Sequence, residues 1–167
     1  MTPDAEVGAA PFELFREAMA GLASGVSVVT ARRPDGAPCG LAATSVSSFS
    51  AHPPSVLVSV AHASRCHEAL AAGEWFGVHL LSAAQEEVAR VFASLSDDKF
   101  ADLDWDWEGE VPVLGSALAY LRCRRSAHFE HHDHSIVIGD VIDGRHESGE
   151  PLVYMRQRMS WRLGEVE

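Results

Sequence analysis

The chain has 167 residues, 47% of them hydrophobic, enough to bury one core, so we expect a single domain over residues 1–167. Its formal charge is −11, from 13 basic and 24 acidic residues, which argues against nucleic acid or an anionic membrane as a partner. No apolar run approaches the roughly 20 residues that span a bilayer, and the first residues are acidic where a secretory signal is basic, so we expect a cytoplasmic protein.

The first predicted element is a helix that begins at Pro11. Its apolar residues recur three and four positions apart, as they do on a helix that buries one face. These residues are Phe12, Phe15, Met19 and Leu22. The elements predicted next are strands over 26–31, 56–60 and 75–81 and helices over 64–72 and 82–93.

Ser82 is a plausible N-cap of the last of these helices, with Gln85 completing a capping box. An acidic, tryptophan-bearing loop is predicted over 97–110, as a solvated lid or the edge of a dimer. The remaining predicted strands cover 117–123, 126–130, 135–142 and 152–155. Many short strands with few helices favour an antiparallel barrel.

Residues 40–50, GLAATSVSSFS, form a Ser/Thr-rich stretch between two apolar runs. Small hydroxyl residues let a chain approach a flat ligand closely and offer it donors. The same composition also suits a simple turn between two strands. The hydroxyl candidates are Thr44, Ser45, Ser47, Ser48 and Ser50.

The chain resembles the short-chain flavin reductase family, the reductase components of two-component flavin-dependent monooxygenases. The resemblance covers residues 12–163 and rests on an ordered series: FREAMAGLASGVSVVT, GLAATSVSSFS, HPPSVLVSV, Asp133-His134 leading into HSIVIGDVID, and PLVYM. It implies a mainly β fold, a split β-barrel of the Greek-key, FMN-binding type with a few flanking helices. It also implies a homodimer with flavin bound near the subunit interface.

The activity implied by the resemblance is that of an NAD(P)H:flavin oxidoreductase, which reduces FMN or FAD with NADH or NADPH and supplies diffusible reduced flavin to a partner monooxygenase. The two cofactors carry out the hydride transfer, so no catalytic triad is required. The sequence contains no G-x-S-x-G, P-loop or G-x-G-x-x-G after a strand. Two alternatives stay open: a non-catalytic flavin- or haem-binding sensor or storage protein on the same barrel, and a flavin-using oxidase.

By resemblance, residues 42–45, including Ala43, lie along the isoalloxazine edge, and Ser48 and Ser50 lie nearer the ribityl-phosphate. Relatives often carry Thr and Asn where this chain has Ala42 and Thr44.

Anionic cofactors need local positive charge in so acidic a chain. Ser64 and Arg65 are predicted to open a helix whose N–H groups and guanidinium bind phosphate. Lys99 resembles a basic position that helps to bind flavin phosphate in relatives, and the alternative is a solvated lysine. Arg156 is a candidate for the dinucleotide phosphates, or else a surface charge.

His134 is the candidate catalytic residue. Relatives have Gly-Asp-His before this strand, with the histidine beside the nicotinamide, and this chain has His132-Asp133-His134. Loss of the glycine matters because glycine alone adopts positive φ cheaply.

Neighbouring histidines invite a metal hypothesis, but no thiolate or well-placed carboxylate completes a set, so no metal is predicted. The three cysteines, Cys39, Cys66 and Cys123, lie far apart without C-x-x-C spacing and are expected to be reduced and incidental.

Overall fold

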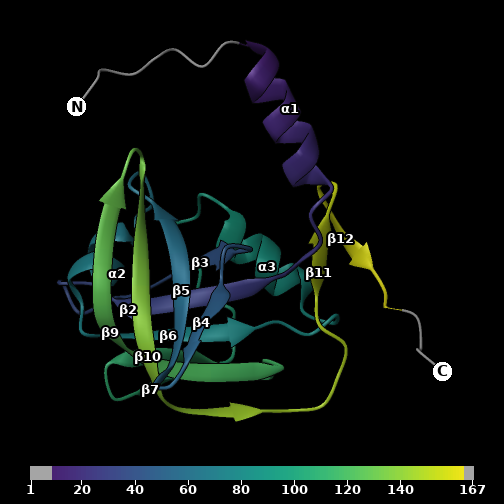
Figure 1. Cartoon of the computed structure of the whole chain (residues 1–167). Helices are drawn as coiled ribbons and strands as arrows, with labels where there is room; N and C mark the ends of the chain where they lie inside the picture. Colours follow the sequence, from purple (N-terminus) through teal and green to yellow (C-terminus); the bar gives the residue numbers. More distant parts are fainter. Residues whose placement is uncertain (1–8, 164–167) are drawn as a thin grey trace.

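The structure is a computed structural model that describes residues 9–163 (Figure 1). The ends of the predicted domain, residues 1–8 and 164–167, lie outside this range. The main element is a seven-stranded sheet with the order β3-β2-β6-β9-β10-β5-β4, in which every pairing is antiparallel. Its strands are β2 (Ser27–Arg32), β3 (Pro38–Ala43), β4 (Ser47–Ala51), β5 (Pro54–Ala61), β6 (Trp75–Leu80), β9 (Ala119–His131) and β10 (His134–His146).

The two edge strands of this sheet, β3 and β4, are consecutive in the chain and are joined by residues 44–46. Neighbouring strands lie about 4.8 Å apart, so a connection this short cannot cross a flat seven-stranded sheet. The sheet therefore curls until its edges approach each other. In the described part of the chain these edges are not paired, so the barrel stays open along a line that we call the split. The prediction of a mainly β, split-barrel fold is confirmed.

Smaller elements surround the barrel (Figure 1). The helix α1 (Ala9–Ala20) projects away from it, as Figure 1 shows. Among residues 9–163 no helix is long and apolar enough to cross a membrane. The remaining elements are a three-stranded sheet of β1 (Ser24–Gly25), β11 (Val153–Met155) and β12 (Arg158–Trp161), a hairpin of β7 (Trp105–Glu108) and β8 (Val111–Leu114), and the helices α2 (His67–Ala72) and α3 (Glu86–Ala93).

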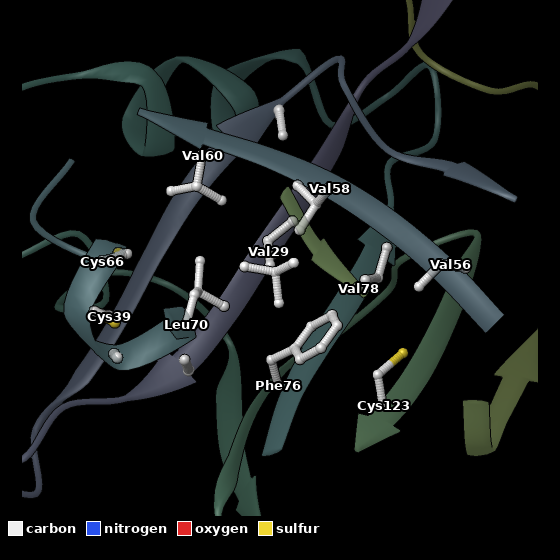
Figure 2. Close-up of a cluster of buried hydrophobic side chains, with 14 residues drawn as sticks. Val29, Cys39, Val56, Val58, Val60, Cys66, Leu70, Phe76, Val78 and Cys123 are labelled. Atoms are coloured by element: carbon white, nitrogen blue, oxygen red, sulfur yellow. The ribbon is translucent and has the colours of Figure 1, made fainter. Parts of the chain in front are cut away.

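Strand β2 is buried on both faces because two hydrophobic clusters cover it. Val29 packs inside the barrel with Val58 and Phe76 (Figure 2). Val28 belongs to the second cluster, which includes Phe92 of α3. This second cluster fixes α3, and with it the loop that follows α3, on the outside of the barrel.

Two strand predictions were too short and one loop prediction was wrong. The strands expected over 117–123 and 126–130 form one strand, β9, because pairing with β10 continues where the apolar alternation fades. Residues 105–108 of the expected acidic loop form β7, which pairs with β8. Trp105 packs against the second cluster, so the alternation of tryptophan with acidic residues in W-D-W-E is a strand pattern. The acidic residues led to its prediction as a loop.

Two helices begin later than predicted. The helix expected from Ser82 begins at Glu86, and only half of the capping box forms: Gln85 Oε1 accepts a hydrogen bond from the Ser82 N–H at 3.0 Å. The helix expected from residue 64 begins at His67, after a turn.

Candidate active site

The split opens into a pocket with a volume of about 430 Å³. One wall is β3 with the turn at residues 44–46, and the opposite wall is the end of β5 with residues 61–66. The loop after α3, with Lys99 and Phe100, closes the third side. Glycine is required in the β3 wall because a Cβ on Gly40 would collide with the ring of Phe92.

Three of the residues predicted to bind the flavin line this pocket: Ala43, Thr44 and Ser45. Thr44 is exposed at the turn, and the Ser45 hydroxyl donates a hydrogen bond to the Ser59 carbonyl oxygen at 2.9 Å. Because its proton is used in this bond, the Ser45 hydroxyl can only accept a hydrogen bond from a ligand. The Thr44 hydroxyl can also donate one.

The other predicted hydroxyls lie on β4, beyond the pocket wall. The Ser47 hydroxyl donates to the Ser48 carbonyl oxygen at 3.2 Å, and Ser48 pairs with Val56 in the sheet. Ser50 Oγ accepts from the His52 N–H at 3.2 Å, within the turn before β5. Their assignment to the cofactor stays a prediction, and the structure does not bring these three serines to the pocket.

Lys99 lines the pocket, and its role toward flavin phosphate stays a prediction. Its Nζ donates to the carbonyl oxygens of Phe92 at 2.7 Å and Gly40 at 3.4 Å. Burial lowers the pKa of the Lys99 ammonium from its ordinary value. An ammonium has three donors, so one N–H remains to meet an anion in the pocket.

Arg65 and Ser64 also line the pocket, but they precede the helix rather than open it. The Arg65 guanidinium forms an ion pair with Asp97. It also donates to the carbonyl oxygens of Leu95 at 2.7 Å and Ser96 at 2.8 Å, which ties the loop after α3 to the opposite wall.

The expected free N–H groups at this helix start are partly occupied. Ser64 Oγ accepts from the Cys66 N–H at 3.3 Å, and the Ser64 carbonyl oxygen accepts from the His67 N–H at 2.9 Å. This helix start is therefore a weaker phosphate site than the sequence indicated. Arg156 lies elsewhere, in the turn between β11 and β12, and its role stays a prediction.

His134 begins β10 and does not line the pocket, but it pairs across the sheet with Ala61, which does. Its contact with the dinucleotide stays a prediction. Its Nδ1 lies 2.9 Å from Asp133 Oδ1, and this hydrogen bond lowers the pKa of the Asp133 carboxyl. The position of the missing glycine, His132, has φ +50°, the left-handed conformation that the pattern of relatives indicated.

Several residues near the pocket were not found from the sequence. Arg33, Cys39 and Cys66 line it. Beside it, the fully buried Ser135 Oγ lies 3.1 Å from His62 Nε2 and 2.8 Å from His67 Nε2. The alternation along β10 predicts which face of the strand Ser135 lies on. No spacing in the sequence shows that His62 and His67 come close to that face. Within residues 9–163, no group of three or more His, Cys, Asp or Glu side chains is arranged to hold a metal ion.

Comparison with known proteins adds an independent line of evidence. The family described as flavin reductase like domain matches residues 19–161. An NADH-dependent FMN reductase of Agrobacterium fabrum is 40% identical over 141 residues, covering 84% of this chain and 80% of the relative. The reductase component of the 4-nitrophenol 4-monooxygenase/4-nitrocatechol 2-monooxygenase of Rhodococcus opacus is 36% identical over 144 residues, covering 86% and 77%. The NADH:FAD oxidoreductase of Streptomyces globisporus, solved in complex with NAD and FAD fragments, superposes with a TM-score of 0.86 at 31% identity, covering 96% of this chain and 98% of that chain.

Proposed function

The chain belongs to the flavin reductase-like domain family, and from that membership we propose that it is an NAD(P)H-dependent flavin reductase. It reduces FMN or FAD and supplies diffusible reduced flavin to a partner monooxygenase. Two of its relatives are named as an NADH-dependent FMN reductase and as the reductase component of a monooxygenase. Its expected location, the cytoplasm, stays a prediction that cell fractionation tests.

The observation that carries this proposal is the pocket at the split. It gathers Arg33, Arg65 and Lys99 in a chain whose formal charge is −11. Its volume of about 430 Å³ lies within the range of small-molecule sites. Cations, hydroxyls and apolar walls together suit a ligand with a flat ring at one end and phosphate at the other.

Lys99 is the phosphate anchor in this proposal. Its two hydrogen bonds to backbone carbonyls hold the ammonium in place, and its partial burial strengthens its attraction for an anion. Arg65 adds charge and holds the loop after α3 closed over the pocket.

The turn at residues 44–46 receives the ring. Thr44 offers a hydroxyl donor and Ser45 an acceptor, which match the carbonyl and N–H groups on the edge of an isoalloxazine. Bound flavin and nicotinamide supply the hydride transfer themselves. The residues of the chain bind the two rings, orient them and exclude water.

His134 orients the nicotinamide from its position beside Ala61 of the pocket wall. The Asp133 carboxylate holds the ring of His134 by Nδ1, which leaves Nε2 free to face a carboxamide. His134 is therefore proposed to contact the dinucleotide and not the flavin.

A steady-state assay tests the proposed function. Purified protein is mixed with FMN or FAD and with NADH or NADPH, and the absorbance of the reduced nicotinamide is followed. Continuous oxidation supports the reductase. Reversible flavin binding without oxidation would indicate the sensor or storage protein, and an inseparable flavin would contradict a diffusible product.

We further propose that the protein is a homodimer that uses α1. The apolar residues that the sequence placed on a buried helix face are exposed instead: Phe12 by 56% and Phe15 by 63%. The helix projects away from the barrel, so within residues 9–163 the chain leaves these side chains exposed (Figure 1). A second apolar pair, Phe129 opposite Ile136, is exposed on β9 and β10.

A further inference from the structure

Two cysteine thiols stand together in the wall of the flavin pocket. Cys39 lies on β3 and Cys66 lies just before α2, and both line the pocket. They are 7% and 4% exposed and belong to the same hydrophobic cluster, in which Figure 2 shows them as neighbours. The two side chains are close enough to influence each other's pKa.

The surroundings shift the pKa values of the two thiols in opposite directions. The neighbouring Cys39 thiol lowers the pKa of Cys66 against the opposing effect of burial, and the charges of Lys99, Arg33 and Arg65 lower it further. The presence of Cys66, together with burial, raises the pKa of Cys39. The three cations, which line the same pocket, therefore favour the thiolate at Cys66.

The third cysteine has a different environment. Cys123 lies on β9, outside the pocket, and burial raises its pKa to about 12. It is buried like the other two, so it serves as a matched control that differs in charge and in partner.

We propose that Cys39 and Cys66 are an oxidation site for hydrogen peroxide, which converts them into a reversible intramolecular disulfide that blocks the flavin pocket. Cys66 Sγ, as thiolate, attacks a peroxide oxygen, the O–O bond breaks, hydroxide leaves and takes a proton from solvent, and Cys66 becomes a sulfenic acid. Cys39 Sγ then attacks Cys66 Sγ. The S–O bond breaks, and the hydroxyl leaves as water with the Cys39 proton. The dithiol loses two electrons and peroxide is reduced to water.

The consequence for activity rests on the proposed function. Reduced flavin that meets dioxygen before it reaches an oxygenase yields hydrogen peroxide, so an uncoupled reductase generates the oxidant in its own surroundings. The disulfide would join β3 to the segment before α2, and these two segments are the walls between which flavin is proposed to bind. The oxidised protein would therefore stop producing reduced flavin until a thiol reductant restores it.

Thiol titration and peptide mass spectrometry test the modification itself. After peroxide treatment and denaturation, we expect the wild type to lose two of its three free thiols and to yield a peptide that links Cys39 to Cys66, both reversed by dithiothreitol. Cys123→Ser should behave like the wild type. Cys66→Ala and Cys39→Ala should each give no linked peptide, and circular dichroism identifies a variant that has not folded. Equal oxidation of Cys123, or sulfinic acid without a linked peptide, would overturn the proposal.

Flavin titration tests the effect on the pocket. The oxidised wild type should bind FMN at least about tenfold more weakly than the reduced protein, and saturating FMN should slow the linkage. A linked protein with unchanged FMN affinity would overturn the proposed block. The NADH oxidation assay on untreated protein reports on the reductase function independently, so failure of either proposal is recognised separately.

Discussion

At the scale of single residues, the pocket depends on a few side chains held by backbone groups. Lys99 is fixed by the carbonyl oxygens of Phe92 and Gly40, and Arg65 by those of Leu95 and Ser96. The carbonyl oxygens that hold Lys99 belong to α3 and β3, whereas those that hold Arg65 belong to the loop after α3, where Asp97 also pairs with its guanidinium. A cation that is already oriented loses little entropy when it binds phosphate.

Replacement of Lys99 should separate phosphate binding from ring binding. A charge-assisted hydrogen bond contributes about 1.5–3 kcal/mol, so Lys99→Ala should weaken FMN binding by about tenfold to a hundredfold. Riboflavin, which lacks the phosphate, should bind as to the wild type, as measured by fluorescence titration. Arg90→Ala removes a positive charge from the exposed face of α3 and is the control. Equal weakening of FMN and riboflavin would make Lys99 a structural residue.

Replacement of His134 should affect the dinucleotide alone. We expect His134→Ala to raise the KM for NADH or to lower turnover, while FMN affinity stays near that of the wild type, because the two cofactors meet different edges of the pocket. His131→Ala, an exposed histidine of the same hairpin, is the control. Unaltered steady-state kinetics in His134→Ala would leave this histidine without a role in the reaction.

His79 should make stability depend on pH. It is fully buried, Nδ1 donates to the Val28 carbonyl oxygen and Nε2 accepts from the Leu114 N–H, so the structure holds one neutral tautomer. Burial lowers its pKa from 6.5 to about 4. Because the folded pKa is the lower one, this contribution is present above pH 6.5 and is lost as the pH falls toward 4.

The expected loss of unfolding free energy is about 3 kcal/mol over that interval, from about 1.4 kcal/mol per pKa unit. Urea unfolding at several pH values measures it. His79→Gln, which cannot titrate, should show a flatter profile, and parallel profiles for the two proteins would refute the assignment.

At the scale of elements, α3 and β3 form the wall that carries the cations. Phe92 of α3 packs directly against Gly40 of β3, and its carbonyl oxygen holds Lys99. The glycine therefore sets how closely the helix approaches the barrel, and the approach of the helix sets the position of the charge.

Gly40→Ala should disturb both the packing of α3 against the barrel and the position of the Lys99 charge. The added methyl collides with the Phe92 ring, and overpacking of this kind costs about 1–3 kcal/mol, so the urea midpoint should fall. FMN affinity should fall as well, because Lys99 moves with Phe92. Gly25→Ala is the control, since its Cβ would lie 3.4 Å from Leu80 Cδ1, an ordinary contact. Equal stability of the two variants would show that α3 moves aside without cost.

At the scale of the whole molecule, α1 exposes an apolar face that no other described part of the chain covers. A helix of 12 residues is marginal on its own, so helices of this length owe most of their stability to packing. A second copy of the chain would supply that packing.

Light scattering after size-exclusion chromatography should therefore show a dimer. The double variant Phe12→Ser and Phe15→Ser should shift the protein toward monomer, because it removes large apolar side chains from the face. Glu17→Ser, a polar change on the same helix, should leave the dimer intact. A wild-type monomer at high concentration would exclude this use of α1.

The sequence by itself determined the mainly β fold class and singled out residues 40–50 as the candidate cofactor stretch. Alternating apolar runs separated by polar turns are local properties of the chain, and residues 40–50 stood out by composition alone. The strand pattern predicted a β-barrel, and the family resemblance added the split barrel, the choice of Lys99 and attention to the turn at His132. The strand pattern is readable from the sequence because it depends on each residue and its immediate neighbours.

Tertiary structure decided which residues of that stretch share one pocket. The short turn between edge strands β3 and β4 places Ala43, Thr44 and Ser45 in the pocket and carries Ser48 and Ser50 away from it, because the chain changes edges there. Cys39 and Cys66 come together only because β3 and the segment before α2 pack across one core. Contacts between strands distant in sequence arise from sheet closure, and no local pattern encodes them.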